Sequence, residues 1–284
     1  MEIRKLTVAA AMLLSACWAS AQNALNTHLY TIVDKVEYTP KQKSLLGVIT
    51  DVIITGQTTT DKAEYCGPVR AAIVRGLSAS HRMSVVDGNA DAAMGNVKPS
   101  YYVDATISNV ATTTKTEVVD EKKKTKRTLY KAIIGVTLHV KDANSGEVVA
   151  SPQISVSDID MSWVESAEGA MEAALNDVAH SVRSYFNRFA PLFANIVESA
   201  RYKSDKQKEV YIDLGEKDGV YKGLHFNVYT VKTVAGKEAK RQVGKLKITD
   251  VQGDDISLCK VQSGGKDIKA AIDNGETISV RSSD

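Results

Sequence analysis

Cysteine, proline, phenylalanine and tryptophan are scarce in this sequence. Its 284 residues include three cysteines, five prolines, four phenylalanines and two tryptophans. Two of the cysteines, Cys66 and Cys259, lie far apart and do not make a disulfide framework. An oxidising compartment would permit one bridge between them, but we expect two buried thiols that pack as small apolar groups. Hydrophobic cores must therefore hold the chain together, and 43% apolar residues suffice for two modest ones.

An excess of charge of one sign is also absent. The 36 basic and 34 acidic residues leave a net charge of +2, so no long-range field favours nucleic acid or an anionic surface. No apolar run of transmembrane length follows Leu29, so membrane contact would need an anchor or a partner. Partners must be inferred from local features.

The N-terminus predicts export. Residues 1–21 have the order of a signal peptide, with Arg4 and Lys5 before an apolar run over residues 6–14 and small residues after it. Cleavage before Gln22 suits ordinary signal peptidase, whereas the stretch that ends in Cys17 is typical of a lipobox. Cys17 is therefore a candidate lipidation site, and both alternatives stay open. We expect a periplasmic protein, with anchoring to the outer membrane if Cys17 is acylated.

Hydrophobic periodicity predicts a first domain over residues 27–200. The clearest strand runs from Ala132 to Val140, where every second side chain is apolar. Pro68 begins a helix whose apolar residues share one stripe, and Ser166 to Phe189 is the longest helical pattern. This order predicts an α/β or α+β fold in which helices cover one face of a mixed sheet. Further strands are predicted over residues 29–36, 46–55, 82–86, 101–110 and 148–150.

The pattern changes after the polar stretch Lys203 to Lys208, which we interpret as a linker. Residues 205–284 alternate short strands with turns and predict a small all-β, barrel-like domain. The glycines at 215, 219 and 223 match neither phosphate-binding fingerprint, so we expect Gly219 and Gly223 to shape turns, with positive φ or a tight approach. The predicted strands cover residues 210–214, 225–234, 243–251, 256–262 and 277–280.

No set of reactive side chains emerges from the sequence. The five histidines fall on five different predicted elements, and no Gly-x-Ser-x-Gly elbow is present. Asp213, Glu216 and Asp218 do not follow the spacing of a calcium loop and are interpreted as solvated turn residues. We predict no catalytic residues, no cofactor and no metal site, and hence no enzyme. A hydrolase that uses scattered serine, aspartate or histidine residues is the competing hypothesis.

One dense basic run lies between two predicted strands. It lacks interleaved aromatic residues, so nucleic acid is not an expected partner. We interpret the run as the solvated tip of a hairpin, since blocks of like charge are usually solvated. Contact with lipid phosphates or an acidic partner is the alternative. The run consists of Lys122, Lys123, Lys124, Lys126 and Arg127.

Two segments resemble known envelope proteins. Residues 82–87, 101–107 and 136–149 resemble stretches of the CsgG-like family, which includes the curli secretion channel subunit and the LpoB-type lipoprotein. This resemblance covers roughly residues 29–190. Residues 215–229 and 243–246 are similar to the small β-module at the end of the flagellar T-ring protein. The resemblances imply a cell-envelope protein that associates side by side or docks onto a partner, without catalysis.

These features together predict a non-enzymatic envelope interaction and assembly protein. Its expected partners are other envelope proteins, with a homo-oligomer or ring as a further expectation. The alternative is a subunit of a curli-type outer-membrane secretion channel. Residues 111–128 are charged, whereas a membrane-crossing strand needs an apolar face over about nine to eleven residues. An assembly role is therefore the better inference from the resemblance.

Overall fold

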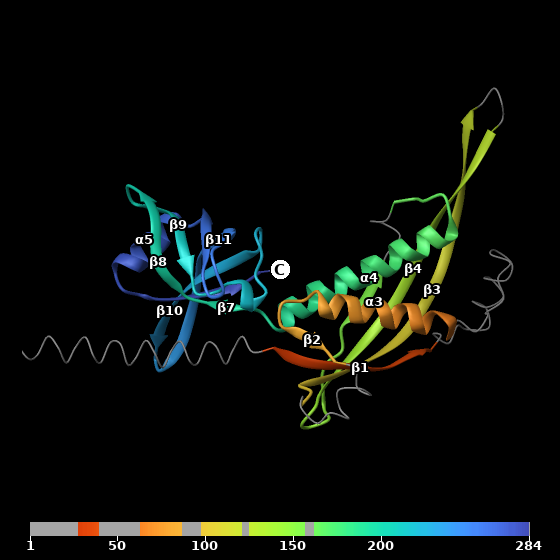
Figure 1. Cartoon of the computed structure of the whole chain (residues 1–284), viewed down its shortest axis with the longest axis horizontal. Coiled ribbons are helices and arrows are strands. Elements are labelled where there is room, and N and C mark those ends of the chain that lie inside the picture. The colour runs from red at the N-terminus through yellow and green to blue at the C-terminus, as the bar shows by residue number, and fades with distance from the viewer. Residues whose placement is uncertain (1–27, 40–62, 87–97, 121–124, 157–161, 284) are drawn as a thin grey trace, which may run out of the picture. The chain divides into compact units, whose positions relative to one another are not determined.

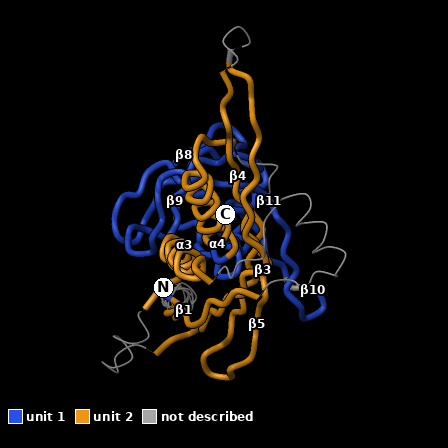
Figure 2. The backbone as a smooth tube through the Cα atoms, turned by 90° about the vertical axis from the view of Figure 1, so that its right-hand side faces the viewer, with its two compact units in different colours: residues 1–28, 186–284 blue, residues 29–185 orange. Residues whose placement is uncertain are grey.

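The computed structural model describes residues 28–39, 63–86, 98–120, 125–156 and 162–283. They fall into two compact units, residues 29–185 and residues 186–284, which Figure 2 shows in orange and blue. The predicted signal peptide with Cys17, the predicted strand over residues 46–55, and Lys122, Lys123 and Lys124 lie outside the described residues. Each unit has its own sheet.

The first unit is built on a mixed sheet, as predicted. Strand β1 runs parallel to both of its neighbours, whereas every other pairing is antiparallel. The strand order is β2-β1-β3-β4-β5, and β6 also pairs with β4. The strands are β1 (Leu29–Tyr38), β2 (Met83–Val85), β3 (Tyr101–Asp120), β4 (Thr125–Asp142), β5 (Val148–Ala150) and β6 (Gln153–Val156).

Two helices cover one face of this sheet, which confirms the expected layering (Figure 1). Helix α3 (Cys66–Ser78) follows the short 3₁₀ helix η1 (Ala63–Tyr65), and α4 (Ala167–Phe189) continues past the end of the unit at Tyr185. The alternation predicted for β4 is confirmed, because its apolar side chains point into the core. Fully buried core residues include Val69, Ile73 and Leu77 of α3, Ala132, Ile134, Val136, Leu138 and Val140 of β4, and Ala174, Val178 and Val182 of α4.

The second unit is an antiparallel sheet in the order β7-β13-β10-β11-β12-β9-β8. One residue, Asn195, separates β7 from β8, so consecutive stretches of chain pair with β13 and with β9, at the two ends of that order. The sheet consequently curls around its core. The strands are β7 (Phe193–Ala194), β8 (Ile196–Lys203), β9 (Lys206–Ile212), β10 (His225–Val234), β11 (Lys237–Val251), β12 (Ser257–Ser263) and β13 (Thr277–Ser282).

Two predictions for this region are wrong. The unit is not all-β, because it contains α5 (Gly265–Asp273) and the 3₁₀ helix η2 (Glu216–Asp218). The expected linker over residues 203–208 is the end of β8, a two-residue turn and the start of β9. An exposed hairpin of polar residues has the composition of a linker, and only the alternate burial of Gln207 distinguishes it. The prediction for Gly219 and Gly223 is confirmed by their φ values of 71° and 108°.

The two described cysteines are not bridged. Both are free thiols, Cys259 buried and Cys66 half-buried, so the expectation of buried thiols is correct for Cys259 alone. Burial raises the pKa of Cys259 to about 12. Among the described residues, no helix combines the length and apolar character needed to cross a bilayer.

Candidate interaction surface

Strands β3 and β4 are much longer than the sequence analysis predicted. Their ladder runs from Tyr101 opposite Asp142 to Asp120 opposite Thr125, whereas β1 accompanies β3 only as far as Ile107. Beyond the helices the two strands continue as a two-stranded ribbon, seen at the upper right of Figure 1 and at the top of Figure 2. We call residues 113–120 and 125–131 the arm. It is the main candidate for a functional surface.

The two faces of the arm differ in chemistry because side chains alternate along each strand. On one face Lys115 and Glu117 stand opposite Leu129 and Arg127. The other face carries uncharged polar and aliphatic side chains, with Lys126 near its end, and we call it the threonine face. Its opposed pairs are Thr114 with Tyr130, Thr116 with Thr128, and Val118 with Lys126.

Trp163 packs against the base of the arm on the charged face. The backbone of Val164 exchanges two hydrogen bonds with Tyr130, at 2.8 and 3.1 Å. The ammonium groups of Lys115 and Lys131 lie 4.7 and 4.8 Å from the centre of the Trp163 ring. Such a cation–π contact contributes about 0.5–1 kcal/mol at an exposed site and about 2 kcal/mol when the cation is desolvated. Lys131 is buried, so its contact is the stronger of the two. The indole therefore joins β3 and β4 to the segment that precedes α4.

A chain of ion pairs continues along the charged face. Glu117 contacts Lys115 at 2.5 Å and Arg127 at 3.3 Å, and Arg127 reaches Glu165 at 3.1 Å. The hydrogen bonds from Lys115 and then Arg127 lower the pKa of the Glu117 carboxyl below its usual value. Exposed ion pairs contribute little individually to the free energy of folding. This set acts mainly by keeping the Glu117 carboxylate charged and in place.

The predicted basic tip is only partly the feature expected. Lys126 and Arg127 are exposed, but Arg127 is engaged by two carboxylates rather than solvated alone. The residues that define the charged face were not predicted from the sequence: they include Lys115, Lys131 and Trp163. The sequence feature that indicates the longer β3 is the abundance of threonine and valine over residues 112–119. Such β-branched residues favour strands even where no apolar stripe is present.

The end of the arm exposes aliphatic surface and backbone. Val118 and Val119 are 57% and 61% exposed. Along residues 113–120 of the arm, no strand among the described residues pairs with the outer edge of β3. An unpaired strand edge with apolar side chains is a template for another chain.

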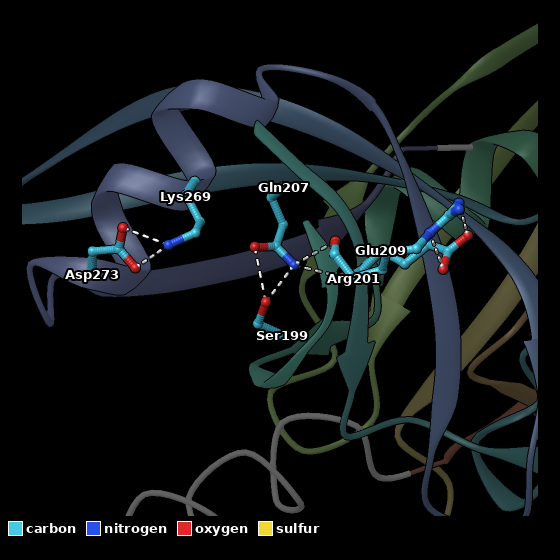
Figure 3. Close-up of polar contacts among 6 residues, drawn as sticks. All are labelled: Ser199, Arg201, Gln207, Glu209, Lys269 and Asp273. Atoms are coloured by element: carbon cyan, nitrogen blue, oxygen red, sulfur yellow. Dashed lines mark hydrogen bonds and ion pairs between the residues drawn. The ribbon is translucent and has the colours of Figure 1, made fainter. Parts of the chain in front are cut away.

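A second polar cluster lies in the other unit, where β8, β9 and α5 meet (Figure 3). The amide nitrogen of the buried Gln207 donates to the carbonyl oxygens of Arg201 and Glu209 at 3.1 and 2.6 Å. The Arg201 and Glu209 side chains form a two-point ion pair at 3.0 and 2.6 Å. Lys269 reaches both carboxylate oxygens of Asp273 at 2.5 and 2.6 Å. These groups satisfy one another, so the cluster stabilises the hairpin and helix rather than presenting a reactive group.

His139 has hydroxyl side chains near its ring, but the distances are long. His139 has the oxygens of Thr106 and Ser151 at 3.4 and 3.5 Å, longer than the roughly 2.6–3.2 Å of a nucleophile and its base. Within the described residues, no group of three or more His, Cys, Asp or Glu side chains could hold a metal ion.

The three carboxylates near Gly215 and Gly219 are not simply solvated. Asp213 accepts hydrogen bonds from the backbone and side chain of Asn195 at 2.6 and 2.8 Å. Asp218 accepts one from the backbone of Gly215 at 3.0 Å, and Glu216 is exposed. Asp213 and Asp218 therefore hold the local backbone, which corrects the sequence interpretation for these two residues.

Comparison with known proteins identifies no family for this chain. No protein-family model matches the sequence, and no curated protein matches it. Among solved structures, PelC from Paraburkholderia phytofirmans, crystallised as a dodecamer, is 15% identical with a TM-score of 0.31 over 56% of this chain and 87% of its own. Protein XCC0632 from Xanthomonas campestris is 11% identical with a TM-score of 0.32 over 56% and 81%. TolB from Acinetobacter baumannii is 9% identical with a TM-score of 0.25 over 84% and 60%.

Proposed function

We propose that this protein is a non-enzymatic interaction protein of the cell envelope, exported to the periplasm or anchored to the outer membrane, that helps to assemble or regulate an envelope machine. The arm is the surface by which it binds other envelope proteins. The observation that carries this proposal is the projecting ribbon, which combines exposed aliphatic side chains with an unpaired strand edge. Buried surface and backbone pairing on a partner would stabilise a ribbon that is marginal in isolation.

The alternative is a secretion channel subunit, in which the same ribbon would cross a lipid bilayer. Strands that cross lipid need an unbroken apolar face of about nine to eleven residues. One face of the arm carries Lys115, Glu117 and Arg127, and the other is dominated by threonine. The chemistry of both faces favours protein contact. Conductance by the purified protein in planar bilayers would support the channel instead.

Two exposed valine pairs provide a matched test of the arm. Val118 and Val119 lie at its end, whereas Val148 and Val149 on β5 are 52% and 49% exposed outside it. We expect the tagged V118D/V119D protein to lose cross-linked envelope proteins that the wild type recovers from its native envelope. The V148D/V149D protein should retain them. Both variants should show wild-type circular dichroism.

Two results would count against the proposal. Recovery of no envelope protein by the wild type would remove the function itself. Equal recovery by both double variants would place the contact elsewhere on the molecule. Quantitative mass spectrometry of the cross-linked products separates these outcomes.

A further inference from the structure

We propose that the outer edge of β3 in the arm pairs with the same edge of a second copy of this chain, antiparallel and centred on Thr116. This inference rests on the proposed function of the arm as a contact surface and names the partner at one edge. The threonine face and the end of the arm then remain available to other proteins.

The two edges of the arm are not equivalent. The β4 edge is occupied near its base by Val164, which bonds to Tyr130, and Arg127 further along is tied to Glu165. Along residues 113–120, no described strand lies beside the outer edge of β3. Within the part of the chain that the structure describes, the accessible backbone of the arm therefore belongs to β3.

The β3 edge is well suited to strand addition. Residues 112–119 consist of four threonines, two valines, Lys115 and Glu117, and contain neither proline nor glycine. Proline, and charges that face inward, are the usual protection of an exposed edge. The only irregularity in this part of the ladder is the register shift between Val118 and Asp120, which limits pairing at the far end.

Two-fold symmetry restricts the registers available to such a pair. In an antiparallel pairing of identical strands about a two-fold axis, one residue must stand opposite its own copy. The centres near the middle of the arm are Lys115, Thr116 and Glu117. A centre at Lys115 opposes two ammonium groups, and a centre at Glu117 opposes two carboxylates. Like charges directly opposite one another destabilise a strand pair.

The register centred on Thr116 has the opposite property. It places Lys115 of each copy opposite Glu117 of the other, so that two attractive pairs form at once. Thr116 meets Thr116, and Thr114 meets Val118. Opposed residues share a face of the combined sheet, so all four charged groups lie on the face that already carries Trp163. This self-complementarity commits the edge to a second copy rather than to an unrelated strand.

Reversing the charges tests both the partner and the register. K115E opposes two pairs of carboxylates in the homodimer, and E117K opposes two pairs of ammonium groups. We expect each single variant to self-associate at least about tenfold more weakly than the wild type in analytical ultracentrifugation. Equimolar mixing of the two variants restores opposite charges at both positions, so a heterodimer should form. The double swap K115E/E117K should also dimerise.

R127E is the matched control. Arg127 also pairs with Glu117, but it lies on β4, one strand away from the proposed junction. Its reversal perturbs the charged face without opposing like charges between copies, so R127E should dimerise as the wild type does. Because the double swap also places a glutamate beside Trp163, its recovery would show that local damage to the arm does not explain the loss in K115E.

Hydrogen exchange of the wild type provides an independent readout. Amides of residues 113–118 should become more protected as the concentration of the protein rises. A wild type that stays monomeric at about 200 μM, or variants that do not complement each other on mixing, would overturn the inference. Protection that does not depend on concentration would show that the edge is covered within a single chain, and would overturn it equally. A monomer that still recovers envelope partners through Val118 and Val119 would leave the proposed function intact.

Discussion

Gly76 of α3 lies close against Ala179 and Val182 of α4. A Cβ added there would collide with the carbonyl oxygen of Ala179 and lie 2.7 Å from the Cβ of Val182. Alanine favours helices over glycine by about 1 kcal/mol, but overpacking against backbone costs about 1–3 kcal/mol, so the clash decides. We expect G76A to lower the free energy of unfolding by roughly 1–2 kcal/mol, measured in urea.

Gly67 in the same helix is the matched control. No atom lies within 4 Å of the position that its Cβ would take. G67A should therefore leave the free energy of unfolding unchanged or raise it by up to about 1 kcal/mol. If both alanine variants lost the same stability, close packing of the two helices would not be the cause.

Cys66 and Cys259 should differ sharply in reactivity. Burial raises the pKa of Cys259 from 9.0 to about 12, whereas Cys66 is half-buried at the start of α3. Because the thiolate is the reactive form, we expect maleimide to label Cys66 in the native protein and Cys259 only in denaturant. The raised pKa also affects stability, because the buried Cys259 thiol resists ionisation that the unfolded chain allows. The free energy of unfolding is therefore unaffected by this thiol below pH 9.0 and falls as the pH rises from 9.0 toward 12. Peptide mass mapping distinguishes the two sites, and rapid native labelling of Cys259 would contradict the assignment.

The arm, as an element, should respond to acid through Glu117. The folded pKa of Glu117 is lowered by Lys115 and Arg127, so its stabilising effect is complete above the ordinary value of 4.5 and is lost as pH falls below that value. Glu165 contributes a second carboxylate to the same chain of pairs. We expect the charged face to loosen below pH 4.5.

Trp163 reports this change directly. The sequence has two tryptophans, and the other, Trp18, lies in the predicted signal peptide, so Trp163 is the only one in a chain that starts at Gln22. Its fluorescence should shift as the pH falls, and the shift should be smaller in E117Q. An identical acid transition in E117Q would assign the effect to another group.

Strand β4 shows where apolar alternation predicts a strand and where it does not. Alternation predicted the core half of β4 because one face is buried against the helices and the other is not. The same strand begins at Thr125, and its first four residues are exposed on both faces, so no apolar alternation marks them. Leu129 is the first buried residue of the strand. Periodicity therefore ended where the helices ended, and β3 and β4 were both predicted too short.

At the scale of the whole molecule, the two units contain separate cores. Ile134 is fully buried in the first unit, and Phe226 is fully buried in the second. Truncation of such side chains to alanine costs about 2–5 kcal/mol. We expect I134A to destabilise the first unit and F226A the second, each without an equal effect on the other.

Two probes follow the units separately. Trp163 fluorescence reports the first unit, and hydrogen exchange of β10 amides reports the second. I134A should shift the Trp163 unfolding curve and leave β10 protection nearly unchanged, with the reverse for F226A. Equal shifts of both probes in both variants would show that the chain unfolds as one cooperative unit.

Local patterns were enough to predict helices α3 and α4, the core strand β4 and the positive φ of Gly219 and Gly223, because burial periodicity and backbone sterics act on neighbouring residues. Other features depend on residues that are distant in the sequence. Folding brings Trp163 to Lys115 and Lys131, joins Gln207 to β8, and places residues 203–208 in a hairpin. These contacts join residues whose pairing depends on strand register, and register is set by the packing of the whole sheet rather than by any one segment.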